Sequence, residues 1–110
     1  IEISGDLVVV GLENETARPV FALEQVRPNP IRGETRFAFS VPARAASTLQ
    51  LFSVDGRLVR TLLDRVVEAG RHQITWDGRD QDGRSVAPGV YFYKLESEQR
   101  SASERLVIIR

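Results

Sequence analysis

Apolar and polar residues alternate along much of this chain, and a period of two predicts β-strands. The clearest example is the segment Thr35-Arg36-Phe37-Ala38-Phe39-Ser40-Val41, in which one face collects the bulky apolar side chains. That face would pack into a core, and the other would be exposed to solvent or lightly covered. No segment keeps apolar residues at the i, i+3, i+4 and i+7 spacing of an amphipathic helix. The pattern therefore favours an all-β domain.

Turn-forming residues divide the other apolar segments at the spacing typical of a β-sandwich. Asp55-Gly56 is a strong hairpin signal because both residues accept the positive φ angles that a tight turn needs. Together with 35–41 the segments make about seven antiparallel strands, so we expect an Ig-like or fibronectin-type β-sandwich. The other predicted strands are 21–26, 49–54, 57–63, 72–76, 90–95 and 106–109.

Four aromatic residues are expected in the structural core: Phe37, Phe39, Trp76 and Tyr91. Trp76, the only tryptophan, shares a strand face with Ile74 and would anchor the two sheets against each other. Its alternative role is a platform on which a sugar ring stacks, but a tryptophan between core-periodic residues is usually buried. Tyr91 would direct its hydroxyl to a backbone group at a corner of the sandwich.

Length, charge and cysteine content narrow the classes of function. A chain of 110 residues suits one domain with a modest core. Its 15 basic and 15 acidic residues give a formal net charge of zero, which disfavours binding to nucleic acid. Cysteine is absent, so disulfides and thiolate catalysis are excluded. The longest apolar runs, 7–10 and 106–109, are too short to span a bilayer, and no membrane insertion is expected.

The residues that carry catalytic chemistry do not form a recognisable set. His72 is the only histidine, so any nucleophile, base and orienting group would have to be built around it. The Gly-x-Ser-x-Gly motif of an activated serine is missing. His72 is more simply a surface or half-buried strand residue. We therefore expect no enzymatic activity and no cofactor.

A metal site is the remaining chemical candidate. Asp77, Asp80 and Asp82 lie on one loop with two glycines, and hard cations bind several carboxylate oxygens on such loops. The spacing fails the EF-hand pattern twice, because Gly78 and Gly89 stand where acidic residues are needed. The alternative is that the aspartates cap amides of their own loop, and we favour it.

The first 19 residues differ from the rest of the chain. A short apolar segment, 6–12, is followed by a polar stretch that ends at Pro19. We expect residues 1–19 to be the end of a preceding domain or a linker, and 20–110 to be the β-sandwich domain. The alternative is that 6–12 pairs on an edge of the same sandwich. Asn14-Glu15-Thr16 matches a glycosylation sequon, a triplet that also occurs often by chance.

Several motifs occur in an order that resembles a known family. The most extended is Trp76-Asp77-Gly78-Arg79-Asp80, followed after a loop by Pro88-Gly89-Val90-Tyr91-Phe92-Tyr93-Lys94-Leu95. Upstream lie Val26-Arg27-Pro28-Asn29-Pro30, Thr35-Arg36-Phe37-Ala38-Phe39, Asp55-Gly56-Arg57-Leu58-Val59 and Ala69-Gly70. Together they resemble the Ig-like family that includes the second domain of flagellar hook-capping proteins and the C-terminal sorting domains of type IX secretion cargo. The resemblance covers 21–110.

This resemblance implies a non-catalytic sorting or cell-surface attachment domain of a secreted, multidomain bacterial protein, recognised by type IX secretion machinery. A last strand with an open edge would be read by strand addition, and its flanking charges would set the register. Arginine stands where many relatives have lysine, which keeps the charge but changes the hydrogen-bond geometry. The residues implied in recognition are Gly89, Val90, Tyr91, Arg105, Leu106, Val107, Ile108, Ile109 and Arg110.

The partners implied are secretion or surface-attachment proteins and upstream domains of the same chain, at a secreted or cell-surface location. Two alternatives come from other classes. One is a carbohydrate-binding or adhesion module of a surface hydrolase, which needs exposed aromatic residues on a sheet face or loop. The other is a structural assembly domain like the Ig-like part of the flagellar hook cap, which acts through protein contacts alone.

Overall fold

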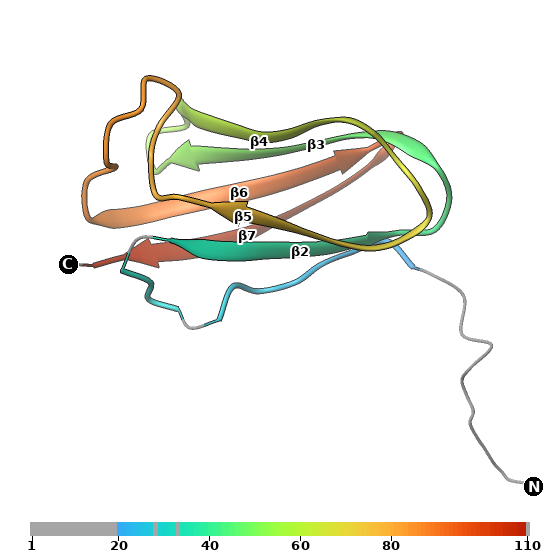
Figure 1. Cartoon of the computed structure of the whole chain (residues 1–110), viewed down its shortest axis with the longest axis horizontal. Helices are drawn as coiled ribbons and strands as arrows, with labels where there is room; N and C mark the ends of the chain where they lie inside the picture. The colour runs from blue at the N-terminus through green and yellow to red at the C-terminus, as the bar shows by residue number, and fades with distance from the viewer. Residues whose placement is uncertain (1–19, 28, 33, 110) are drawn as a thin grey trace, which may run out of the picture.

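The chain forms a two-layer β-sandwich with the strands of both sheets antiparallel (Figure 1). The computed structural model describes residues 20–27, 29–32 and 34–109. The predicted segment 6–12, the sequon at Asn14 and the terminal Arg110 lie outside these residues. The described part of the chain contains no helix with the length and apolar character needed to cross a bilayer. The prediction of an all-β Ig-like sandwich is confirmed.

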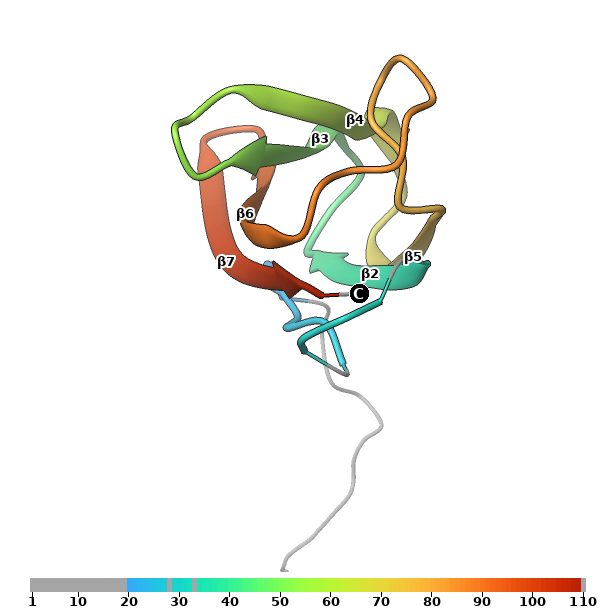
Figure 2. The ribbon, with the colours of Figure 1, turned by 90° about the vertical axis from the view of Figure 1, so that its left-hand side faces the viewer.

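The described residues form seven strands in two sheets, of three and four strands, which face each other in the end-on view of Figure 2. The three-stranded sheet has the order β1-β2-β5, with β1 at Ala22–Leu23, β2 at Thr35–Val41 and β5 at Gly70–Trp76. The four-stranded sheet has the order β4-β3-β6-β7, with β4 at Leu58–Val67, β3 at Ala45–Ser53, β6 at Gly89–Ser97 and β7 at Arg100–Ile108.

The turns follow the residues that predicted them. Gly56 has a φ of 88°, and its N–H donates to the Ser53 carbonyl at 2.9 Å where β3 returns as β4. The prediction of a hairpin at Asp55-Gly56 is confirmed. Between β6 and β7 the turn contains Glu98 with a φ of 57°, a left-handed conformation that short hairpins require.

Several predicted strands have the wrong length. The strands predicted over 49–54 and 57–63 are longer in the structure, where β3 covers Ala45–Ser53 and β4 covers Leu58–Val67. Two further differences concern the first and the last strand. The first is predicted over 21–26, yet β1 covers only Ala22–Leu23. The Glu24 amide still donates to the Ala38 carbonyl of β2, but the Glu24 carbonyl and the Val26 amide bond to a tyrosine hydroxyl instead. The last was expected over 106–109, yet β7 begins at Arg100 and pairs with β6 along its whole length. The residues at the start of β7 are mostly polar and exposed or half-buried, so they lack the apolar alternation that predicts a strand.

The core lies between the two sheets, and aromatic rings connect them. Phe37 from β2 contacts Trp76 from β5 with centroids 6.0 Å apart, and Tyr93 from β6 edge-on at 4.8 Å. Trp76 is 1% exposed, so it anchors the core and offers no platform to a sugar. Phe39 and Tyr91 are also buried. The predicted core residues are therefore all in the core.

Candidate functional site

The two segments implied in recognition come together at one end of the four-stranded sheet. β6 and β7 are antiparallel neighbours, and their register sets Val90 opposite Val107 and Tyr91 opposite Leu106. Gly89 lies opposite Ile108. Residues from two separate motifs therefore lie side by side on two paired strands.

Strand alternation divides these residues between the two faces of the sheet. Tyr91, Leu106 and Ile108 point into the core, with exposures of 8%, 0% and 4%. Val90, Arg105 and Val107 lie on the outer face, where Val90 is 37% exposed. Only the outward residues can contact a partner without unfolding the sandwich. The inward residues support the strand geometry, and the Tyr91 hydroxyl donates to the Ala87 carbonyl at 2.5 Å, as predicted for a corner contact.

On the outer face, an apolar surface that includes Val90 runs across all four strands of the sheet. The register places Leu58 opposite Phe52, Phe52 opposite Phe92, and Val90 opposite Val107. Leu58 and Phe92 are 44% and 38% exposed, whereas Phe52 and Val107 are half-buried. We call these five residues the outer patch: Phe52, Leu58, Val90, Phe92 and Val107.

Beyond the outer patch the same face is mostly polar, apart from Ala46 and Val66 at its opposite end. Arg105 stands opposite Phe92 and closes one side of the outer patch. The next row along the strands reads Thr61, Gln50, Lys94 and Ser103, and the row beyond it reads Asp64, Thr48, Glu96 and Ser101. The apolar residues therefore gather at one end of the face instead of being scattered, which is the pattern of a contact surface.

Sequence patterns did not identify Phe52, Leu58 and Phe92 as surface residues. The run 90–95 carries apolar residues on both strand faces, which predicts a central strand for Phe92. It does lie on a central strand, but nothing in the described residues covers its outer face sufficiently to bury it. The sequence feature that could have identified this surface is the presence of two large apolar residues, Val90 and Phe92, on the same strand face.

The outward edge of β7, expected to be open for strand addition, is occupied where recognition was implied. The Ile31 amide donates to the Val107 carbonyl at 2.9 Å, and the Ile109 amide donates to the Ile31 carbonyl at 2.8 Å. The Asn29 side chain accepts from the Val107 amide at 3.0 Å and donates to the Arg105 carbonyl at 3.4 Å. A partner cannot add a strand here while this segment stays in place.

The aspartates of the loop between β5 and β6 bond to their own backbone. Asp77 Oδ1 accepts from the Arg79 amide at 3.0 Å. Asp80 Oδ1 accepts from the amides of Asp82 at 2.9 Å and Arg84 at 3.0 Å. No group of three or more metal-ligating side chains occurs among the described residues. The prediction that these aspartates cap loop amides is confirmed for Asp77 and Asp80.

His72 is half-buried, as predicted, and its surroundings are structural. Its ring stacks on Phe39 with centroids 5.3 Å apart, and Nε2 lies 2.7 Å from the Glu68 carbonyl oxygen. Both contacts fix the ring against the sandwich.

Tyr93 has a structural role that the sequence did not reveal. Its buried hydroxyl donates to the Glu24 carbonyl at 2.8 Å and accepts from the Val26 amide at 3.0 Å. Burial raises the pKa of the phenol from 10.0 to about 12. The four-stranded sheet thereby holds the segment that leaves β1.

Comparison with known proteins gives a family match over most of the domain. A family model described as the FlgD Ig-like domain matches residues 25–101. The basal-body rod modification protein FlgD of Salmonella typhimurium is 46% identical over 44 residues, which is 40% of this chain. FlgD of Salmonella typhi matches equally. The match spans only 19% of the length of these curated relatives.

Solved structures with a similar fold come from larger chains. Dimeric latent PorU from Porphyromonas gingivalis has a TM-score of 0.66 at 18% identity, over 91% of this chain and 10% of that one. PorZ from the same organism, a surface component of the type IX secretion system, has a TM-score of 0.56 at 25% identity, over 81% and 12%. FlgD from Xanthomonas campestris has a TM-score of 0.55 at 19% identity, over 82% and 66%.

Proposed function

The chain belongs to the FlgD Ig-like domain family, and on that basis we propose that it is a non-catalytic sorting and surface-attachment domain recognised by type IX secretion machinery. In this proposal the parent is a secreted, multidomain bacterial protein. The likeness to PorZ, which is itself a surface component of that secretion system, supports this choice.

The observation that carries the proposal is the outer patch. It places two residues of the implied recognition segments, Val90 and Val107, in one apolar surface with Phe92. Exposed apolar residues with a polar rim are typical of protein–protein contact sites, where aromatic residues and arginine supply much of the binding energy. Arg105 is the polar rim residue nearest Phe92 in the register.

The occupied edge of β7 changes how recognition would work. Because Asn29 and Ile31 already satisfy the backbone groups of Arg105, Val107 and Ile109, a partner would bind the outer face by side-chain contacts. Folding would then precede recognition, since the outer patch exists only when four strands are in register.

Export of a reporter fused to the whole chain in a type IX-competent host tests this proposal. We expect Phe92→Ser, which removes the aromatic centre of the outer patch, to reduce export roughly tenfold and leave the reporter in the periplasm. Val66→Ser is the matched control, because Val66 is 45% exposed at the opposite end of the same face. Tryptophan fluorescence and circular dichroism should show both variants folded. Equal export of both variants would refute the role of the outer patch.

A structural assembly role remains the second candidate, favoured by the 46% identity to flagellar FlgD over 44 residues. A domain-exchange experiment distinguishes the two functions. Replacing the Ig-like part of a flagellar hook-capping protein with this chain should fail to restore hook assembly if the domain is a sorting signal. Restored assembly would favour the structural role.

A further inference from the structure

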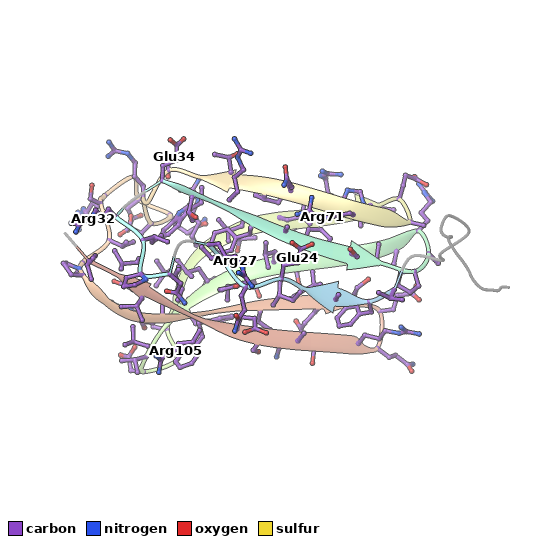
Figure 3. All side chains as sticks on the ribbon, turned by 90° about the horizontal axis from the view of Figure 1, so that it is seen from below. Glu24, Arg27, Arg32, Glu34, Arg71 and Arg105 are labelled. Atoms are coloured by element: carbon purple, nitrogen blue, oxygen red, sulfur yellow. The ribbon has the colours of Figure 1, made fainter. Side chains whose placement is uncertain are left out.

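A second accessible surface lies on the outer face of the three-stranded sheet, on the other side of the sandwich from the outer patch (Figure 3). Two adjoining hollows of about 500 and about 570 Å³ share Arg27 and Arg36 in their lining. We call this surface the arginine groove and define it by Glu24, Arg27, Arg36, Ala38, Arg71 and Gln73.

At one end of the arginine groove, the arginine is paired with a carboxylate. Arg71 on β5 reaches across β2 and donates from Nε and Nη2 to the two carboxylate oxygens of Glu24 at 2.7 and 3.0 Å. Figure 3 shows the two side chains directed toward each other. This bidentate hydrogen bonding lowers the pKa of the Glu24 carboxyl, and the small Ala38 beneath leaves room for the pair. Arg71 and Glu24 therefore form a fixed end wall.

The middle of the arginine groove carries positive charge without a carboxylate partner. Within the described residues, neither Arg27 nor Arg36 forms an ion pair or a side-chain hydrogen bond, and both are exposed. A guanidinium group has a planar fork that matches a carboxylate, so two of them in one groove favour ligands with carboxylates. Glu34 at the far end of the second hollow would repel an anion there. The attractive region is therefore confined to Arg27 and Arg36.

Backbone groups of β2 add a second requirement for the ligand. β1 pairs with β2 only at Phe39 and Ser40, and the ladder ends where the Glu24 amide donates to the Ala38 carbonyl at 3.0 Å. Beyond that point the Tyr93 hydroxyl takes the Glu24 carbonyl and the Val26 amide. By strand alternation the amide and carbonyl of Arg36 point toward this same edge. They have no backbone partner there among the described residues.

We propose that the arginine groove binds an extended acidic peptide, which adds as a short strand beside Arg36 and pairs its carboxylates with Arg27 and Arg36. An extended peptide satisfies both requirements, because its backbone meets the uncovered edge of β2 and alternate side chains meet the guanidinium groups. A sulfated or carboxylated glycan would satisfy the charges only. The proposal does not depend on the outer patch, which lies on the other sheet.

Fluorescence anisotropy with a labelled octapeptide of alternating Thr and Glu tests the proposal on the whole chain. We expect binding at low salt, weakened about tenfold by Arg27→Gln and by Arg36→Gln, since each removes a charge-assisted hydrogen bond. Arg65→Gln is the control, because Arg65 is an exposed arginine of β4 on the other sheet. It should leave the affinity unchanged.

Three ligands separate the peptide from other anions. The peptide with Gln in place of Glu should bind at least about tenfold more weakly, because the carboxylates are lost. A version with N-methylated backbone amides should also lose binding, because it cannot pair with a strand edge. Equal binding of the N-methylated peptide would overturn the proposal, and so would binding of labelled dextran sulfate without binding of the Thr-Glu peptide. A loss of peptide affinity in Arg65→Gln equal to that in Arg27→Gln and Arg36→Gln would overturn the proposal as well.

Discussion

At the scale of single residues, Tyr93 connects the two layers by polar as well as apolar contacts. Its ring packs edge-on against Phe37 at 4.8 Å, and its hydroxyl satisfies two backbone groups of the segment after β1. A buried backbone group that loses its partner costs far more than an exposed one. The hydroxyl therefore determines where β1 stops pairing with β2.

Replacing Tyr93 with phenylalanine keeps the ring and removes only the hydroxyl. We expect the free energy of unfolding to fall by about 1–3 kcal/mol, because the Glu24 carbonyl and the Val26 amide lose their shared partner. Urea unfolding followed by circular dichroism measures the change. A variant as stable as the parent would mean that water replaces the hydroxyl at no cost.

The same hydroxyl makes stability depend on alkaline pH. The pKa of Tyr93 is about 12 in the folded chain against an ordinary value of 10.0, so the folded state holds this proton more tightly. The associated stability is complete below pH 10.0 and is lost as the pH rises toward about 12. We expect the stability advantage of the parent over Tyr93→Phe to shrink over that interval. Urea titrations at several pH values test this, and a constant difference would contradict it.

At the scale of elements, irregular segments cover part of both edges of the four-stranded sheet. Asn29 and Ile31 bond to the edge of β7. On the opposite edge, the Gln81 amide donates to the Val59 carbonyl at 3.0 Å, and its side-chain oxygen accepts from the Thr61 amide at 2.7 Å. The covered parts of an edge cannot pair with strands of other chains, which helps to protect a β-sandwich from aggregation.

Asn29→Ala tests the cover on β7. We expect a loss of about 1 kcal/mol in stability and faster hydrogen exchange at the Val107 amide, because the Asn29 side chain accepts from that amide at 3.0 Å. Gln81→Ala is the matched control on the other edge, and it should speed exchange at the Thr61 amide while leaving Val107 unchanged. Unchanged exchange at Val107 in Asn29→Ala would show that the cover is too weak to matter.

At the scale of the whole molecule, the two sheets share one core. Trp76 belongs to the three-stranded sheet and Tyr93 to the four-stranded sheet, yet both rings contact Phe37. Neither sheet can keep its apolar face buried without the other, so the sandwich should fold as one unit.

Cooperative unfolding is therefore the expected behaviour of the whole chain. Trp76 fluorescence, which reports on the small sheet, and near-ultraviolet circular dichroism of the tyrosines, which reports on the large sheet, should give coincident urea transitions. Far-ultraviolet circular dichroism should match both. Separate midpoints for the two probes would mean that the sheets unfold independently.

The sequence alone was sufficient for the all-β class, the Asp55-Gly56 hairpin and the aromatic core. Alternation along a strand is a local consequence of backbone geometry, so the inward residues Phe37, Phe39 and Trp76 follow from their neighbours. The caps provided by Asp77 and Asp80 were also predictable, since they bond within their own loop.

Tertiary structure alone decided which surfaces are open to a partner. Asn29 covers the edge of β7 from 78 positions away, and Tyr93 reaches the Glu24 carbonyl across 69 positions. The outer patch needs four strands in register, and the arginine groove needs Arg27 to lie beside Arg36 where β1 ends. Periodicity describes how each strand divides its own residues between two faces, but exposure depends on what distant segments do or do not cover.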